Sequence, residues 1–158
     1  MRRTAGSAGH GTSRGDGFGG AADRAVTPWK TAGMFDHISI QAQDPSASAA
    51  FYDTVLAPLG AGRVLDFGEV IGYGSAGPAF WLGPADAAAE AREVHIAFAA
   101  ADRRTVDAFH EAAVKAGAVV LHSPRLWPEY HESYYGAFVR DPDGNNVEAV
   151  CHRPDWPE

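Results

Sequence analysis

Three side chains of the kinds that bind transition metals lie in short strand-like runs of this sequence. His37 lies in DHISIQ, His95 in VHIAFA and Glu148 in NNVEAV. Imidazole nitrogens and a carboxylate oxygen are the donors of two-histidine, one-carboxylate metal sites, which leave coordination positions open for a substrate. Taken singly, each residue has a plainer interpretation, with Glu148 facing solvent and each histidine packed in the structure. The elements that carry the three residues decide between these interpretations.

The two histidines belong to an internal repeat with an offset of 58 residues. Residues 36–44 read DHISIQAQD and residues 94–102 read VHIAFAAAD, so that His37 aligns with His95. Apolar residues alternate with other residues in both copies, as in a strand with one buried face. Each histidine lies on the face opposite the apolar residues. If the two halves pair, the histidine faces are expected to meet.

A helix and three short strands are expected after each repeat strand. Asp44 and Asp102 suit helix N-caps, and Gly60 and Gly117 suit the helix ends. The predicted buried helix faces are Ala47, Phe51, Val55 and Leu56 in the first half, and Val106, Phe109 and Val114 in the second. The predicted strands are residues 62–67, 69–73 and 78–82, then 118–122, 134–140 and 145–150.

Each half is therefore predicted to be a βαβββ module, the first over residues 34–83 and the second over 93–152. The pair is expected to form an α+β fold with a curved mixed sheet around a central cavity. Residues 1–33 hold 8 of the 18 glycines and no periodic apolar pattern. Such a segment cannot bury enough apolar surface to offset chain entropy, so we expect a flexible tail before one domain at 34–158.

Composition and charge argue against several classes of partner. A net charge of −7 argues against nucleic acid and anionic membranes. No apolar run approaches the roughly 20 residues of a membrane helix, and no secretory signal is visible. A single cysteine, Cys151, fits a reducing compartment. A cytoplasmic protein is expected.

The tetrapeptide DPDG at 141–144 predicts which way Glu148 faces. A type I turn followed by a left-handed glycine pairs Phe138 with Glu148 across a hairpin. Tyr134 then shares the face of Glu148, while the mostly apolar alternate positions, with Val147, meet the helix. Glu148 is thus predicted on the inner face with the two histidines, where a bound cation compensates its charge.

In this order and spacing, FDHISIQ, EVHIAF and FVRDPDGNNVEAV resemble the vicinal oxygen chelate superfamily of glyoxalase I, extradiol dioxygenases, and fosfomycin- and bleomycin-resistance proteins. The resemblance covers residues 34–152. It implies one divalent metal ion (Fe, Mn, Ni, Co or Zn) held by His37, His95 and Glu148, often in a site shared across a homodimer. The implied function is a metal-dependent lyase, isomerase or dioxygenase acting on a small substrate with vicinal oxygens. The alternatives are a drug- or metabolite-sequestering protein of the bleomycin-resistance type and a fosfomycin-type thiol transferase.

Departures from these relatives leave the reaction open. Glyoxalase I takes a fourth metal ligand from the strand that here reads PAFWLG, where neither Phe80 nor Trp81 can bind a metal. One of these two aromatic residues is expected to fill that position. Dioxygenases carry a histidine whose spacing His131 fits, and a tyrosine where this chain has Phe138.

The remaining candidates surround the predicted metal. The loop 123–133, SPRLWPEYHES, is expected to be a movable cover over the cavity mouth. Glu148, His131 and Tyr134 are the expected catalytic residues, acting in proton transfer or substrate hydrogen bonding. The expected substrate contacts are Trp81, Arg125 and Phe138. His110 and His122 are interpreted as surface or packing residues, and His152 as an incidental residue just past the last strand.

Overall fold

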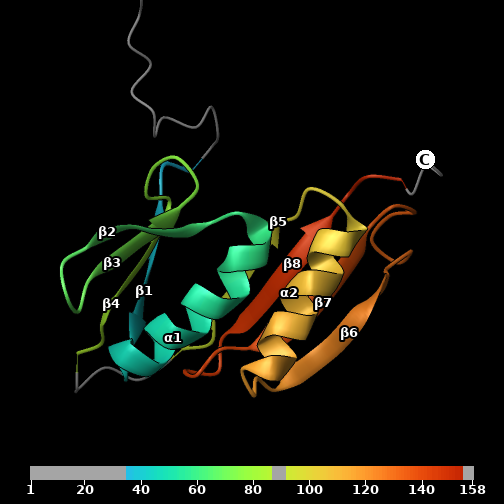
Figure 1. The fold of residues 1–158 in the computed structure, drawn as a ribbon. Coiled ribbons are helices and arrows are strands. Elements are labelled where there is room, and N and C mark those ends of the chain that lie inside the picture. Colours follow the sequence, from blue (N-terminus) through green and yellow to red (C-terminus); the bar gives the residue numbers. More distant parts are fainter. Residues whose placement is uncertain (1–34, 87–91, 155–158) are drawn as a thin grey trace, which may run out of the picture.

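The computed structural model describes residues 35–86 and 92–154, so the predicted tail at 1–33 lies outside the described residues. The elements follow in the order β1 (Ile38–Ala42), α1 (Pro45–Leu56), η1 (Ala57–Leu59), β2 (Gly62–Asp66), β3 (Ile71–Gly74), β4 (Phe80–Pro84), β5 (His95–Ala99), α2 (Arg103–Lys115), β6 (Val120–Leu126), β7 (Tyr135–Arg140) and β8 (Asn146–Cys151). Figure 1 shows both halves as a helix packed on strands. Two βαβββ modules are present, as predicted.

Each module forms its own four-stranded mixed sheet. The first has the strand order β1-β4-β3-β2 and the second the equivalent order β5-β8-β7-β6. The first strand pairs in parallel with the last in both modules, and the other pairs are antiparallel. The predicted α+β fold of two repeated modules is confirmed, with β1 and β5 each at the edge of its sheet.

The helices begin and end where the sequence indicated. The Asp44 carboxylate accepts from the Ala47 amide at 3.0 Å, and the Asp102 carboxylate accepts from the Thr105 amide at 2.7 Å. These bonds satisfy amides that have no partner in the first helical turn. After the helical segments the chain reverses at glycines 60 and 117, whose φ angles of 73° and 80° are left-handed.

The buried helix faces differ from the prediction at two positions. Ala47 is exposed, while Ser48 and Tyr52 are buried, because their hydroxyls bond to the second module. In α2 the buried residue is Ala113, and Val114 is 50% exposed. Both corrections shift the buried face by about one residue, and in α1 the shift follows from contacts with the other module, which a single-helix pattern does not reveal.

The two modules share one hydrophobic core. Figure 1 shows α1 and α2 side by side, and the two helices contact each other. Between the sheets, the ring of Phe80 in β4 meets Phe98 in β5 edge to face at 5.4 Å. Among the described residues, no helix is long and apolar enough to cross a membrane.

A buried polar joint also links the modules. The Tyr52 hydroxyl of α1 donates to Asp141 Oδ2 at 2.8 Å, and the Ser48 hydroxyl donates to Asp143 Oδ2 at 2.8 Å. Asp143 Oδ1 also accepts from the Gln43 amide just before α1. A carboxylate at this end of a helix meets unpaired amides and the positive end of the helix dipole. The turn that precedes Glu148 is therefore fixed to the first module.

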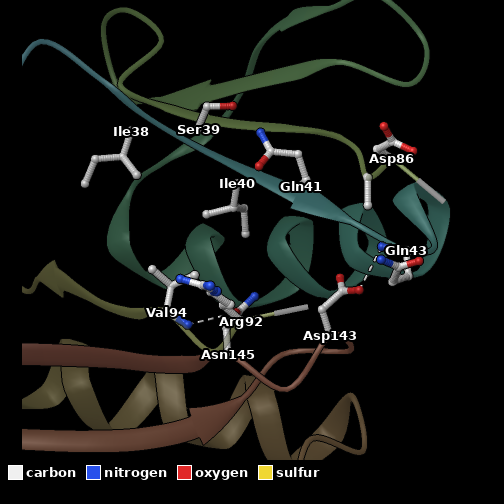
Figure 2. A pocket seen from close by; sticks show the side chains of 11 residues that line it. Ile38, Ser39, Ile40, Gln41, Gln43, Asp86, Arg92, Val94, Asp143 and Asn145 are labelled. Carbon is white, nitrogen blue, oxygen red and sulfur yellow. Dashed lines mark hydrogen bonds between the residues drawn. The ribbon is translucent and has the colours of Figure 1, made fainter. Parts of the chain in front are cut away.

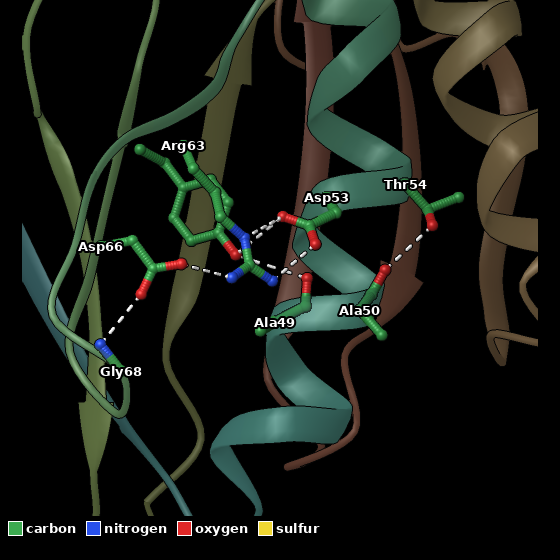
Figure 3. Close-up of polar contacts among 8 residues, drawn as sticks. Ala49, Ala50, Asp53, Thr54, Arg63, Asp66 and Gly68 are labelled. Carbon is green, nitrogen blue, oxygen red and sulfur yellow. Dashed lines mark hydrogen bonds and ion pairs between the residues drawn. The ribbon is translucent and has the colours of Figure 1, made fainter.

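A second polar network holds the outer hairpin of the first module against α1. Arg63 of β2 binds both oxygens of Asp53 at 2.8 and 2.7 Å and reaches Asp66 at 2.7 Å, as Figure 3 shows. The Tyr73 hydroxyl donates to Asp53 at 3.1 Å. This network lies on the helix side of the sheet, away from His37.

Candidate functional site

Glu148 lies on the face of the second sheet that α2 does not cover. The predicted hairpin register is confirmed, with Phe138 opposite Glu148 and Val139 opposite Val147. Gly144 completes the turn at φ 85°. Tyr135, of opposite parity, donates its hydroxyl to Asp107 of α2 at 2.8 Å. The alternation of β7 and β8 therefore aims Glu148 away from the helix, yet its side chain is only 1% exposed.

Two side chains hydrogen-bond the buried carboxylate, one at each oxygen. His95 Nε2 lies 2.9 Å from Glu148 Oε2, and the Tyr134 hydroxyl donates to Oε1 at 2.6 Å. Gly136 makes room for this arrangement, because a Cβ there would lie 3.0 Å from Oε1 and 3.3 Å from the Tyr134 ring. Both oxygens of the buried carboxylate therefore have a hydrogen-bonding partner, which offsets the cost of burying the charge.

The environment of Tyr134 keeps its hydroxyl protonated. Burial, followed by the hydrogen bond to Glu148 and the charge of that carboxylate, raises the pKa of Tyr134 well above its usual range. The rings of Tyr130, His131 and His152 surround the Tyr134 ring with centroids at 4.9, 5.5 and 5.0 Å. Tyr134 is therefore a fixed hydrogen-bond donor at neutral pH.

An aromatic floor extends from the carboxylate toward β6. Phe138, next to Glu148, is buried, and the rings of His95 and His122 stand edge to face against it with centroids at 5.9 and 5.5 Å. The Trp127 ring forms the end of this floor, with its centroid 5.0 Å from the centroid of Phe138. A ligand on this face meets one carboxylate, aromatic surface and several imidazoles.

The segment expected to be a loop at 123–133 is partly a strand. Residues 123–126 belong to β6, where Arg125 pairs with Gly136 and Leu126 with Tyr135. The prediction was wrong there because Pro124 is tolerated in an edge strand, which needs no amide on its open side. Trp127 is also buried, and its Nε1 donates to the Gly136 carbonyl at 3.1 Å. Only the turn after Trp127 remains as a candidate cover.

Two of the predicted ligand contacts have partners within the chain. The Arg125 guanidinium lies 3.3 Å from the Trp127 ring centroid and donates to Glu129 at 2.9 Å. His131 Nε2 lies 2.9 Å from His152 Nδ1. His131 thus contacts the site by packing its ring against Tyr134. Among the described residues it makes no hydrogen bond to Glu148.

The first module places its candidates on the matching open face. Trp81 pairs with Ser39 of β1, and both belong to the uncovered side, whereas Phe80 is buried against α1. Parity therefore leaves Trp81, and not Phe80, on the side of His37. The His37 side chain is 54% exposed, and its Nδ1 lies 2.7 Å from Asp36.

The structure thus brings together His95 and Glu148 and leaves His37 apart from them. Within residues 35–86 and 92–154, no three His, Cys, Asp or Glu side chains are grouped as a metal site requires. One imidazole and one carboxylate, aimed at each other, are two donors of the expected type. The set fits a divalent metal only with a third donor, for which the exposed imidazole of His37 has suitable chemistry.

Cavities between the modules lie away from Glu148: one of about 540 Å³ lies beside α1 and the turn at Asp141, and two others flank β1 and β5. The cavity of about 460 Å³ runs along the free edge of β1, where Figure 2 shows Ser39, Gln41 and Arg92 around it. The cavity of about 420 Å³ is mainly apolar and lies between β5 and the loop before β4. None of these cavities contains the buried carboxylate, so its chemistry rather than cavity size identifies the candidate site.

Sequence reasoning gave no site role to Gly136 or His122, and it treated Trp127 only as one of several loop residues that could touch a ligand. His122 was interpreted as a surface or packing residue, but its ring lies on the floor beside Phe138. Gly136 and Trp127 shape the space around the carboxylate and the floor. The hairpin register available from the sequence already placed Gly136 on the face of Glu148, whereas the strand pairing of β6 was needed to place His122 and Trp127.

A comparison with protein families assigns the chain. The family model described as a glyoxalase-like domain matches residues 37–150, most of the chain. The chain belongs to the glyoxalase-like domain family. The predicted membership of the vicinal oxygen chelate superfamily is thereby confirmed. No protein with a curated description matches the chain.

Solved structures share this fold. A glyoxalase/bleomycin resistance protein from Albidiferax ferrireducens is 29% identical, with 75% of this chain and 98% of that chain covered and a TM-score of 0.66. A lactoylglutathione lyase from Agrobacterium tumefaciens is 24% identical, with 76% and 93% covered and a TM-score of 0.57. A glyoxalase-related enzyme from Fulvimarina pelagi is 23% identical, with 76% and 88% covered and a TM-score of 0.58. The last two likenesses concern the fold alone.

Proposed function

We propose that this glyoxalase-like protein is a divalent-metal-dependent enzyme that acts on a small substrate with vicinal oxygens. His95 and Glu148 of one chain would hold the metal together with His37 of a second chain in a homodimer. The observation that carries the proposal is the buried Glu148 carboxylate facing an exposed imidazole on an uncovered sheet face. A bound metal would supply Lewis acidity, which polarises substrate oxygens and stabilises an enolate-like or oxyanionic charge.

The protein's own side chains would prepare the reacting region. Tyr134, kept protonated by its surroundings, holds Oε1 of Glu148 and fixes the direction of the carboxylate. The aromatic floor of Phe138 and Trp127 excludes water on one side. Trp81 stands on the open face of the first sheet, where glyoxalase I has a further ligand, so that a coordination position would remain for substrate.

The first experiment measures metal content directly. Protein made without a histidine tag is expected to contain about one divalent metal per chain by elemental analysis. Glu148→Gln, which keeps the size of the side chain and removes its charge, is expected to lose the metal and to remain folded. Ser123→Ala, an exposed change on β6, serves as the matched control. A wild-type protein that takes up no metal after chelation and reloading would rule out the proposal.

A second experiment asks whether two chains build each site. His37→Ala and Glu148→Ala each remove one donor and are expected to be metal-free. The two variants are then mixed and their chains allowed to exchange. If the site is shared in a closed two-fold dimer, each mixed dimer regains one intact site. Because about half of the dimers are mixed, roughly a quarter of the wild-type number of sites is restored. If the three donors come from one chain, mixing restores none.

A binding protein that sequesters a drug or metabolite is the second candidate. The observation in its favour is that His95 and Tyr134 already occupy both oxygens of Glu148, so the carboxylate needs no cation. Such a protein would bind its ligand equally well before and after chelation. Loss of ligand binding on chelation, with recovery on adding the metal back, favours the enzyme.

A further inference from the structure

His122 occupies the far end of a row of side chains that begins at Glu148. Phe138 pairs with Glu148 on one side and with His122 on the other, so the three residues lie on neighbouring strands β8, β7 and β6. With strands about 4.8 Å apart, the backbone of His122 is roughly 10 Å from that of Glu148. The ring contacts of His122 with Phe138 and Trp127 place it on the same uncovered face.

The imidazole of His122 is held by its ring while its polar atoms stay available. Its centroid lies 4.8 Å from that of Trp127 and 5.5 Å from that of Phe138, both edge to face. The residue is exposed, and within the described part of the chain no hydrogen bond or ion pair is made by either ring nitrogen. A side chain fixed in direction and unpaired at its polar atoms can bind a ligand at little cost in conformational entropy.

The charges near His122 favour an acceptor group on that ligand. Arg125 lies on the ring of Trp127, the same ring that His122 contacts. Its charge is partly offset by Glu129, which accepts from its guanidinium. A carboxylate would accept a hydrogen bond from the imidazole and be attracted by the guanidinium, and charge-assisted hydrogen bonds of this kind are among the stronger ones.

We propose that His122 determines substrate specificity by binding a carboxylate at the end of an elongated substrate. This inference rests on the proposed function, because the vicinal oxygens of the substrate are placed at the metal beside His95 and Glu148. The apolar middle of the substrate lies over Phe138, and the carboxylate reaches His122 roughly 10 Å from Glu148.

The test compares two chelating probes on metal-loaded protein by calorimetry. Catechol carries vicinal oxygens only, and 3-(3,4-dihydroxyphenyl)propanoate adds a carboxylate at the end of a flexible arm. The propanoate is expected to bind at least about tenfold more tightly than catechol, as one charge-assisted hydrogen bond allows. His122→Phe, which keeps the ring packing, is expected to abolish that advantage and leave catechol binding unchanged. His122→Gln should recover part of it.

The control variant Ser123→Ala, one residue along β6, should keep the full advantage of the propanoate. Equal binding of the two probes by the wild type, or an advantage that survives in His122→Phe, would overturn the role of His122 while leaving the metal site intact. If neither probe binds the metal-loaded protein, both the role of His122 and the proposed chelating function fail. Circular dichroism and thermal melting of each variant confirm that the fold is retained.

Discussion

Removal of one buried hydroxyl is expected to weaken the joint between the modules. Tyr52 is 0% exposed, and its hydroxyl donates to Asp141 Oδ2 at 2.8 Å. Asp141 also accepts from the Asn145 amide, the Asn145 side chain and the Asp143 amide. Tyr52→Phe removes one hydrogen bond to a buried carboxylate and leaves the others. The expected loss is about 2 kcal/mol of unfolding free energy, since bonds to charged groups contribute roughly 1.5–3 kcal/mol.

Urea denaturation measures this loss, which corresponds to a fall of roughly 1 M in the midpoint. The matched control is Tyr73→Phe, because the Tyr73 hydroxyl makes longer bonds, at 3.1 Å to Asp53 and 3.3 Å to the Ala49 carbonyl. Asp53 also keeps both bonds to Arg63, so the control should lose less than about 1 kcal/mol. A loss in Tyr52→Phe no larger than in Tyr73→Phe would refute the view that the Tyr52–Asp141 bond joins the modules.

Three further predictions concern stability and titration. Gly144→Ala should cost about 1–2 kcal/mol in urea denaturation, since φ is 85° and no atom lies within 4 Å of the new Cβ to add a clash. The hydrogen bonds from Thr105 lower the pKa of Asp102. Ionised Asp102 should therefore stabilise the fold above the usual aspartate pKa of about 3.9, and this stabilisation should be lost as the pH falls through the lowered pKa. Asp102→Asn should accordingly reduce the fall in melting temperature at acid pH. The pKa of Tyr52 is raised by burial and by Asp141, so its stabilising effect is complete below about pH 10 and falls as pH rises further. Ultraviolet titration should show that the Tyr52 phenol ionises at a higher pH in the native protein than in the unfolded chain.

The sequence by itself determined the modules, their helix ends and the hairpin. These features depend on short-range rules: the aspartate caps, the left-handed glycines and the DPDG turn each act within a few residues. The direction of Glu148 followed from the same turn, because strand parity transmits the register along the hairpin. The repeat alone was enough to indicate that the two histidines occupy equivalent positions, although His95 begins β5 and His37 lies one residue before β1.

The tertiary structure decided how the repeated elements face one another. Ser48 and Tyr52 are buried because Asp143 and Asp141 of the other module accept their hydroxyls, a contact no local pattern contains. Equivalent positions in a repeat need not be neighbours in space, so the repeat did not reveal that His37 lies apart from His95 within one chain. The distance between the two histidines is set by the packing of whole modules through their helices and shared core, whereas the direction of each side chain is set by its own strand.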